Sequence, residues 1–379
     1  MLQPAAAAEV REKMDAKMDQ FIALPGYVPH DILSGAESPS KDYGDCGDSW
    51  MWGINYLTRS VLAPNHNGGQ DLRLAIELGT NFSMLCPDRL PDAARTFARP
   101  GGGDAWPRPS PVPNFVWADG SFMAMVLPAR LAVGAVGPWA EKGAATRWIG
   151  DLVAMHVDGY RKYLRDPADG LYRHGYNYLK REASCCKWGR ANGWLMMSRV
   201  EVLLAAKKLR APRTAELVSA LHEHASALCT HADARTGLLH QLVNESASFL
   251  ETSSTAMSHW AITTAVQEGI LPRSFAGCIT TLWRGVASTV DQSGAVSLDS
   301  GFSHHSLSEP TRRHRCLACA KAARSTGIRR ITSTGFVLKF YFFQKHDLKK
   351  AFSAAPRLRR EQLRWRGLGI ARGGRHAQV

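Results

Sequence analysis

The sequence predicts an all-α protein built from paired helices. Apolar residues recur at the i, i+3, i+4 spacing of amphipathic helices through residues 1–310, while the alternation typical of strands is scarce. There is also a weak internal repeat, because residues 166–174 (DPADGLYRH) resemble residues 233–240 (DARTGLLH) after an interval of 67 residues. Each copy follows a long helical segment and precedes a loop. This repetition favours a toroid of helical hairpins whose loops converge on one cleft.

The helices follow one another along the chain, each with its apolar residues on one face. Clusters of Gly, Pro and Asp mark the loops between them. The predicted helices span residues 10–24, 49–62, 71–86, 120–134, 146–164, 193–209, 212–230, 252–269 and 272–290. The stretch 87–113 is instead rich in Pro and contains three consecutive glycines, so we expect a loop there.

Charge divides the chain into two parts. The formal net charge is +14, but residues 311–379 hold 18 Lys/Arg against two acids, and the rest of the chain is nearly neutral. We therefore expect a helical domain over residues 1–310 and a basic tail over residues 311–379. The tail has no zinc-finger spacing, heptads or RNP-like run, so we do not expect a nucleic-acid partner. Binding of nucleic acid by the charge of the tail alone is the alternative.

The sequence predicts neither a membrane protein nor a secreted protein. No window reaches the roughly 18 apolar residues of a membrane span. The N-terminus carries a short alanine run followed by charges, without the apolar core of a signal peptide. We expect a cytoplasmic protein with no membrane partner, and a truncated start is the alternative.

The eight cysteines stand at irregular spacing and do not predict a disulfide framework in a chain of this length. Cys185 and Cys186 are adjacent, and adjacent residues rarely pair with each other. Cys316 and Cys319 beside His314 have metal-like spacing but lack a second ligand pair. No zinc site is therefore expected.

The segment WGRANGW, residues 188–194, is the most informative stretch of the chain. Trp188 and Trp194 bracket Arg190. Indole rings provide flat faces on which a sugar can stack, and a guanidinium group is a fork for a carboxylate. The combination suits an acidic sugar. The alternative is a helix start with two core tryptophans and a surface arginine.

Three further residues have two interpretations each. Asp119 stands at a predicted helix start, either as an N-cap or as a general acid/base among aromatic residues. His174 lies in a loop between two tyrosines, either as a structural residue or as part of a site. Glu251 opens the segment ETSSTAM, which is either a capping segment or the source of a second carboxylate in the cleft.

Taken together, these motifs resemble glycoside hydrolase family 105, the unsaturated rhamnogalacturonyl hydrolases, and the related unsaturated glucuronyl hydrolases of family 88. Order and approximate spacing of the motifs agree over about residues 48–300. The matching segments are PNFVWADGSFM (113–123), GLYRHGY (170–176), WGRANGW (188–194) and FLETSSTAM (249–257).

The resemblance implies an (α/α)6 barrel and a particular reaction. Such enzymes remove a 4,5-unsaturated uronic acid from the non-reducing end of oligosaccharides left by polysaccharide lyases. An acid protonates C4, water adds to C5, and the resulting hemiketal rearranges so that the glycosidic bond breaks. One carboxylic acid that acts as acid and then base suffices, so the two-carboxylate spacing of ordinary glycosidases does not apply. The reaction requires no metal or organic cofactor.

The resemblance also assigns roles to residues. Asp119 is the expected acid/base, which burial among aromatic side chains helps to keep protonated. His174 is expected to hydrogen-bond the substrate or the water, and Arg190 to contact the uronate region. The remaining expected substrate-binding residues are Trp117, Met123, Trp188, Trp194 and Glu251. Rhamnogalacturonan is the expected source of the substrate.

The chain departs from the family pattern in two places. A helical hairpin before Asp119, which carries a second aspartate in the family, is shortened or missing; Asp45, Asp48 and Asp71 are the candidates for that aspartate. The last hairpin is replaced by the basic tail, for which a frameshift or misread intron is favoured over a genuine extension. We therefore expect an incomplete barrel.

Other functions stay open at this point. A sugar epimerase on the same fold would use His174 and His240 as its acid and base. An ordinary inverting glycosidase would use Asp119 and Glu251. A catalytically impaired homologue that only binds carbohydrate is a further alternative.

Overall fold

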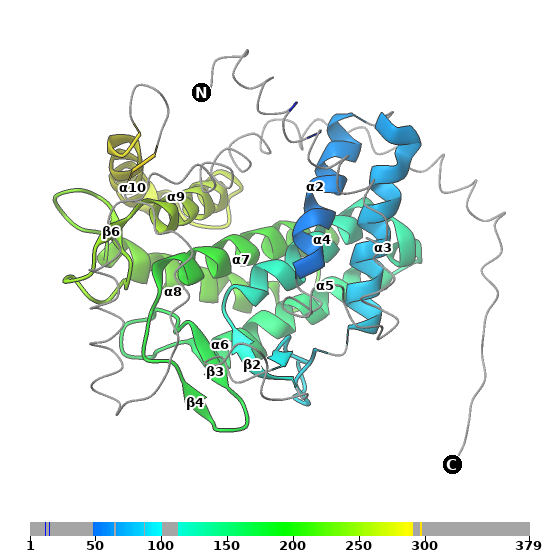
Figure 1. Ribbon diagram of the computed structural model, residues 1–379, viewed down its shortest axis with the longest axis horizontal. Coiled ribbons are helices and arrows are strands. Elements are labelled where there is room, and N and C mark those ends of the chain that lie inside the picture. Colours follow the sequence, from blue (N-terminus) through cyan, green and yellow to red (C-terminus); the bar gives the residue numbers. More distant parts are fainter. Residues whose placement is uncertain are drawn as a thin grey trace.

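The computed structural model describes residues 12, 15, 48–63, 66–86, 88–100, 113–290 and 296–297. Most of them are helical (Figure 1), which confirms the predicted class. The rest of the predicted helix over residues 10–24 and the tail over residues 311–379 lie outside the described residues. So do Asp45 and the group formed by His314, Cys316 and Cys319.

Four helical hairpins make up the described part. They are α2 (Asp48–Leu62) with α3 (Gln70–Leu85), α4 (Gly120–Gly134) with α5 (Ala144–Ala154), α7 (Gly189–Leu209) with α8 (Thr214–Thr230), and α9 (Thr252–Gln267) with α10 (Ala276–Ser288). Short 3-10 turns η1 (His66–Gly69), η2 (Gly137–Ala140) and η4 (Arg273–Phe275) lie next to them. Between α3 and α4, residues 88–100 and 113–117 contain no helix, in line with the shortened hairpin that the sequence predicts.

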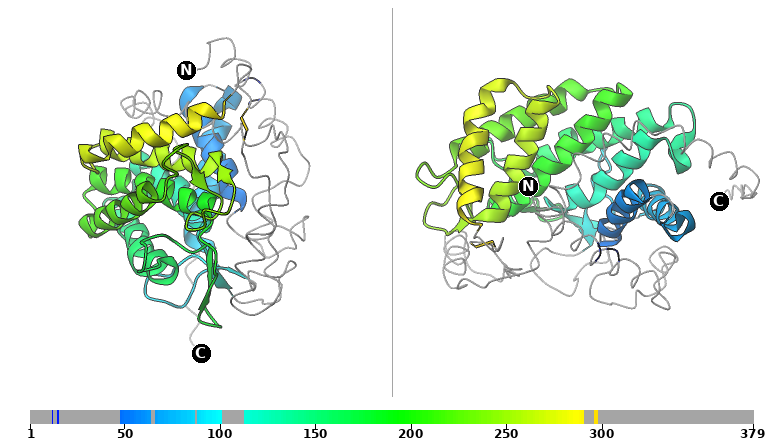
Figure 2. Two further views of the ribbon diagram at one scale, coloured as in Figure 1. Left: turned by 90° about the vertical axis from the view of Figure 1, so that its left-hand side faces the viewer. Right: turned by 90° about the horizontal axis from the view of Figure 1, so that it is seen from above.

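The hairpins stand in a row. Figure 2 shows α2 and α3 at one end and α9 and α10 at the other, with α4 and α7 between them. Twelve of the 15 residues of α4 and 15 of the 21 residues of α7 are buried, which is typical of helices enclosed on all sides. Arg130 of α4 and Glu201 of α7 form a buried ion pair at 2.5 Å between these helices. Thus α4, α7 and α9 are the inner helices on which the site is built.

The helix predicted over residues 146–164 is interrupted. After α5 it continues as a π-helical segment, η3 (Met155–Tyr160), and ends with α6 (Arg161–Leu164). Gly159 in η3 lies directly against Thr96, and a Cβ atom at this position would collide with the Thr96 side chain. Glycine therefore lets the loop before α4 pack closely on this helix.

Short strands connect the loops at one end of the hairpins. A four-stranded sheet consists of β1 (Arg99–Pro100), β2 (Pro113–Trp117), β3 (Gly175–Asn177) and β4 (Glu182–Ala183), and a second pair consists of β5 (Leu239–His240) and β6 (Leu250–Glu251). In the antiparallel β2–β3 pair Trp117 lies opposite Gly175. Gly175 has no room for a Cβ atom because the Phe115 ring lies against it. The sheet thereby joins the segment before α4 to the loop that contains His174.

The internal repeat is confirmed as a repeated turn. The amide of Gly170 donates to the carbonyl of Asp166 at 2.9 Å, and the amide of Gly237 donates to the carbonyl of Asp233 at 2.7 Å. Both glycines have a positive φ, +75° and +79°, which favours glycine at these two positions. Each turn leads from one hairpin into the strand that precedes the next.

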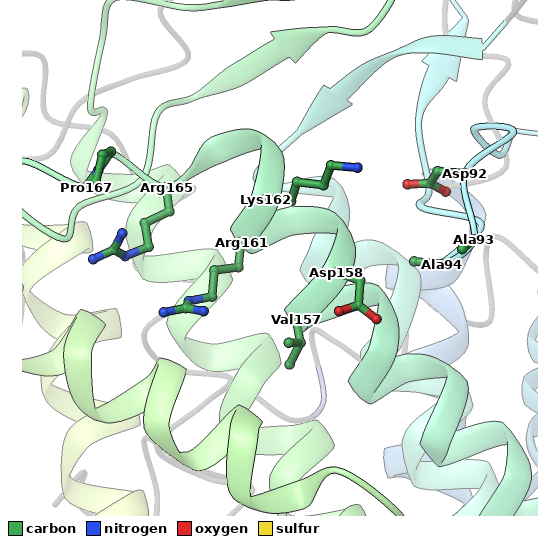
Figure 3. A pocket seen from close by; sticks show the side chains of 9 residues that line it. All are labelled: Asp92, Ala93, Ala94, Val157, Asp158, Arg161, Lys162, Arg165 and Pro167. Carbon is green, nitrogen blue, oxygen red and sulfur yellow. The ribbon is translucent and has the colours of Figure 1, made fainter.

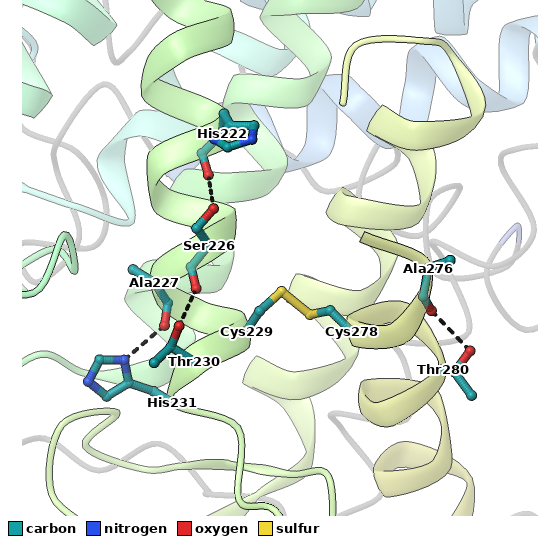
Figure 4. The surroundings of a disulfide bond; sticks show 9 residues. All are labelled: His222, Ser226, Ala227, Cys229, Thr230, His231, Ala276, Cys278 and Thr280. Atoms are coloured by element: carbon teal, nitrogen blue, oxygen red, sulfur yellow. Dashed lines mark hydrogen bonds between the residues drawn. A yellow bond between two sulfur atoms is a disulfide. The ribbon is translucent and has the colours of Figure 1, made fainter. Parts of the chain in front are cut away.

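The irregular cysteine spacing predicts no disulfide framework, but some of the cysteines are paired. Cys229 of α8 and Cys278 of α10 form a disulfide (Figure 4), and Cys86 is also disulfide-bonded. The cysteine spacing did not reveal this pairing, because it depends on α8 and α10 packing with these two Cα atoms 5.6 Å apart. Cys185 and Cys186 are not disulfide-bonded, and their Sγ atoms lie 3.1 Å apart.

Among the described residues, no helix is both long and apolar enough to cross a membrane. The same part of the chain contains no cluster of three or more His, Cys, Asp or Glu side chains that could hold a metal ion.

A buried polar network lies between η3, α7 and α8. His156 and His224 are completely buried, and desolvation, followed by the positive charge of Arg199, lowers the pKa of both well below the ordinary value. Arg199 is also fully buried, and its Nη1 lies 2.9 Å from Nδ1 of His224. Because a guanidinium group only donates, Nδ1 must accept, which requires neutral His224.

These histidines predict that the protein loses stability in mild acid. Their pKa is lowered by folding, so below the unfolded value of about 6.5 the unfolded chain takes up protons that the folded chain refuses. From pH 7.5 to 5.5 each histidine should lower the free energy of unfolding by up to about 1.4 kcal/mol. Urea unfolding at both pH values measures the loss, and His224→Gln should remove about half of it.

The matched control is His222→Gln on the same helix, since His222 is exposed. This variant should keep the pH dependence of the original protein. An equal effect of the two substitutions would contradict the assignment to the buried network.

Candidate active site

Asp119 is buried but does not cap its helix. It follows β2 and immediately precedes α4, is 6% exposed, and makes no side-chain hydrogen bond to the first turn of α4. Its Oδ2 atom has no hydrogen-bond partner in the described part of the chain. Burying a carboxylate oxygen without a partner costs free energy, so such groups are found where a ligand is bound or changed. This geometry favours the acid/base interpretation over the N-cap.

His174 is neutral in this arrangement. Nε1 of Trp117 lies 2.7 Å from Nε2 of His174, and Oδ2 of Asp119 lies 3.5 Å from the same atom. An indole nitrogen only donates, so Nε2 accepts and the imidazole proton is on Nδ1. The contact between Asp119 and His174 is therefore not an ion pair in this state.

The backbone of His174 joins three distant segments. Its amide donates to the carbonyl of Cys186 at 2.9 Å, and its carbonyl accepts from the amide of Ala118 at 3.0 Å. Ala118 is next to Asp119, and Cys186 is two residues before Trp188. These two bonds bring the predicted acid, the histidine and the tryptophan motif together.

Trp188 and Arg190 continue the site at the start of α7. The rings of His174 and Trp188 are 4.9 Å apart in an edge-to-face contact, and the Arg190 guanidinium lies over the Trp188 ring at 4.4 Å. The helix begins at Gly189, four residues earlier than predicted, so Arg190 lies in its first turn. Both side chains are half-buried. A cation stacked on an indole ring and next to a neutral imidazole can receive a sugar carboxylate.

Trp194 and Met123 lie one turn further into the helices. The Trp194 ring packs on Phe122 of α4 at 4.7 Å, and both Trp194 and Met123 are half-buried against the core. Met257 of α9 packs against Gly193, where a Cβ atom would be only 2.9 Å from its Cβ. These residues hold α4, α7 and α9 together beneath the site, and their contact with substrate stays a prediction.

Glu251 caps α9. Its carboxylate accepts hydrogen bonds from the amides of Ser253 at 3.3 Å and Ser254 at 2.6 Å, and the side chain is fully buried. This is the capping arrangement that the sequence offered as one alternative. His240 is bonded through Nδ1 to the carbonyl of Ser248 at 2.7 Å, and no hydrogen bond or ring contact among the described residues joins it to His174.

Asp71, one candidate for the second active-site aspartate, is already bonded to another side chain. Two hydrogen bonds of 2.6 and 2.7 Å join the buried Asp71 carboxylate to Arg59 in the last turn of α2. Asp71 therefore has a structural role at the end of this helix. Asp48, a second candidate, is the first residue of α2.

Lys187 stabilises the loop next to Trp188 through ion pairs. It is buried and pairs with Asp166 at 2.8 Å and with Asp169. The hydrogen bond from Lys187 is the largest cause that lowers the pKa of Asp166. Asp166 belongs to the repeated turn, so this ion pair ties the turn to the tryptophan motif.

Asn192 also helps to form the site, although the sequence does not predict a role for it. Its side-chain amide donates to the carbonyls of Tyr172 and Trp188, and its Oδ1 accepts from the amide of Tyr172 and from Nε2 of His224, each bond measuring 2.9 Å. The position of an amide on an otherwise apolar face of α7 was the available signal. Asn192 thus fixes the loops that carry His174 and Trp188.

Tyr160 is a second missed residue. It is fully buried in η3, and desolvation raises the pKa of its hydroxyl, with the negative charge of Asp119 a smaller cause in the same direction. The phenol therefore stays protonated in the neighbourhood of Asp119.

A match to a family model shows which family the chain belongs to. The model of Glycosyl Hydrolase Family 88 matches residues 94–310, more than half of the chain. The chain belongs to glycosyl hydrolase family 88. The matched range includes Asp119, His174 and the tryptophan motif.

Individual relatives agree with this family. The unsaturated rhamnogalacturonyl hydrolase YesR of Bacillus subtilis (strain 168) is 31% identical over 99 residues, which are 26% of this chain and 28% of that protein. The match thus spans well under half of the relative's length.

Solved structures of low sequence identity share the fold. A family 105 glycoside hydrolase of C. acetobutylicum ATCC 824 has a TM-score of 0.57 at 17% identity, covering 88% of this chain and 91% of that chain. The unsaturated glucuronyl hydrolase of Bacillus sp. GL1 has a TM-score of 0.53 at 13% identity, covering 77% and 73%. The predicted (α/α)6 barrel architecture is confirmed, and the described residues supply four of its hairpins.

The Asn192 network predicts a specific effect of Asn192→Asp. An aspartate can still accept from Tyr172 and His224 but cannot donate to the two carbonyls, and its charge is buried, so the free energy of unfolding should fall by about 2–4 kcal/mol. Chemical denaturation measures this loss. Asn177→Asp on β3 is the control for an added charge, with a smaller expected effect because, among the described residues, its side chain only accepts one hydrogen bond, from the amide of Lys180. Equal losses in both variants would contradict the role of Asn192.

Proposed function

We propose that this protein removes a 4,5-unsaturated uronic acid from the non-reducing end of lyase-generated oligosaccharides by hydrating the C4=C5 double bond. The observation that carries this proposal is the buried Asp119 carboxylate, which neither caps α4 nor has a partner at Oδ2. Membership of family 88 supports the general reaction.

Asp119 is the general acid/base. In its protonated form it delivers a proton to C4 of the enoate, and as a carboxylate it then takes a proton from the water that adds to C5. The hemiketal formed at C5 opens, and the released hemiacetal at C1 expels the rest of the oligosaccharide. No second carboxylate is needed, which agrees with the commitment of Glu251 and Asp71 to other contacts.

The neighbouring side chains position the sugar. Neutral His174 presents its Nε2 side to Trp117 and Asp119, which leaves the Nδ1 proton to donate to a hydroxyl group or to the attacking water. Arg190 pairs with the uronate carboxylate, and Trp188 offers a face for the sugar ring. Trp117, Met123 and Trp194 complete the walls of this site.

Rhamnogalacturonan fragments are the proposed substrates. The support is the partial match to an unsaturated rhamnogalacturonyl hydrolase at 31% identity. The glucuronyl hydrolase from Bacillus sp. GL1, at 13% identity, is the more distant relative. The proposed partner is therefore a short acidic oligosaccharide, bound without a metal or organic cofactor.

Loss of the enoate absorbance of an unsaturated rhamnogalacturonan disaccharide tests this proposal. Wild-type protein should consume the absorbance, and Asp119→Asn should lower kcat by about 10²- to 10⁴-fold, the usual contribution of a general acid/base. Asp151→Asn on the exposed side of α5 is the matched control and should keep full activity.

Different outcomes would overturn the substrate, the role of Asp119 or the activity itself. Consumption of only a glycosaminoglycan-derived unsaturated disaccharide would overturn the substrate while leaving the reaction intact. Equal activity of Asp119→Asn and wild type would overturn the role of Asp119. No consumption of either disaccharide by the folded protein would overturn the activity.

A further inference from the structure

A pocket of about 630 Å³ lies on the outer side of the η3–α6 helix, and none of the predicted site residues lines it. Figure 3 shows Lys162 extending from this helix toward Asp92, while the guanidinium groups of Arg161 and Arg165 point to the other side. Three cationic side chains thus line the pocket within two turns of helix. Its volume is within the usual range for small-molecule sites.

The acidic side chains of the pocket are already bonded. Asp158 accepts two hydrogen bonds from Arg213, which are the largest cause of its lowered pKa. Asp92 accepts from the amide of Thr96 at 2.8 Å and from the hydroxyl of Tyr163 at 3.1 Å. In the described part of the chain Lys162 forms no ion pair, and it is exposed.

Positive charge also dominates behind the pocket. Arg161 and Arg165 share the single carboxylate of Glu223. Arg199 is fully buried and has no ion pair with an acidic side chain among the described residues, although the charges of Arg161 and Glu223 reach it. Two guanidinium groups on one carboxylate leave an excess of positive charge at the wall of the pocket, and Arg199 adds to it from the interior.

An aromatic surface leads from the pocket toward the site. Tyr163, over whose ring the Lys162 ammonium lies at 5.2 Å, stacks on Tyr176 of β3 at 5.1 Å. Tyr178 meets the same ring edge-on at 6.0 Å. Tyr176 is two residues after His174, so cationic groups and half-buried aromatic rings extend from the pocket to the strand next to the candidate active site.

We propose that this pocket is an accessory binding site for the carboxylate of an acidic saccharide, with Lys162 as its main contact. That the ligand is a saccharide rests on the proposed function. That it is an anion follows from the excess of positive charge and does not depend on the proposed function. A carboxylate pairs with Lys162, and the adjoining sugar ring lies along the tyrosines. The volume suits a sugar unit better than a lone inorganic anion.

Calorimetric titration with saturated tetragalacturonate tests the proposal. This ligand lacks the double bond, and Arg190→Ala as the background weakens binding at the active site. At low salt Lys162→Glu should weaken binding by about threefold or more, the effect expected from exposed charge pairs. The matched control is Lys142→Glu, an exposed lysine just before α5, which should leave binding unchanged.

Each alternative outcome overturns the inference. Equal weakening by the two lysine variants would indicate general charge attraction. Displacement of tetragalacturonate by an equal concentration of inorganic phosphate would indicate a simple anion site. Unchanged binding in Lys162→Glu would exclude the pocket, and the same comparison in the wild-type background answers the question if Arg190→Ala does not fold. Hydrolysis of the unsaturated disaccharide is measured separately, so its absence bears on the proposed function alone.

Discussion

The site depends on two backbone hydrogen bonds of one residue. His174 donates to Cys186 and accepts from Ala118, residues that are 12 and 56 positions away along the chain. Asn192 reinforces the same junction through the carbonyls of Tyr172 and Trp188. Loops are normally mobile, yet this arrangement fixes the loop residues of the site relative to α4 and α7. The backbone bonds of His174 and the side chain of Asn192 therefore hold the acid, the histidine and the tryptophan motif in place.

The protonation state of His174 depends on which of its neighbours can donate a hydrogen bond. Trp117 can only give a hydrogen bond, so His174 faces it without a proton on Nε2. Asp119 consequently receives no hydrogen bond from His174, and its Oδ2 has no donor among the described residues. This oxygen is therefore not committed to another contact in the described part of the chain and can exchange a proton with a bound substrate. The proposed hydration needs this exchange from a single group.

The helical class and the repeated turn could be predicted, because the spacing of apolar residues and the two turns that run from an aspartate to a glycine are local features of the sequence. The contacts that bring Asp119, His174 and Trp188 together could be anticipated only through the family resemblance. What was missed depends on packing between distant segments. The Cys229–Cys278 bond is one example, since nothing in the spacing shows that α8 and α10 are neighbours.

Other errors had local causes that only tertiary structure resolves. The start of α7 was placed at Gly193, because Gly189 and Gly193 both resemble loop residues; in the fold, Gly189 is needed where α7 meets Ser254 of α9. Glu251 had two interpretations with the same sequence signature, and the amides of the first turn of α9 decide between them. The amide of Asn192 on an apolar face of α7 indicates burial, but the partners that it bonds come from distant segments and cannot be read from the sequence.

In the proposed reaction, the first bond to change is the C4=C5 double bond and not the glycosidic bond at C1. A matched pair of disaccharides tests it, one with the C4=C5 double bond and one saturated at these carbons, followed by release of the second sugar. We expect release from the unsaturated compound only, in step with the loss of its absorbance. Comparable release from the saturated compound would contradict it, because direct displacement at C1 does not require the double bond.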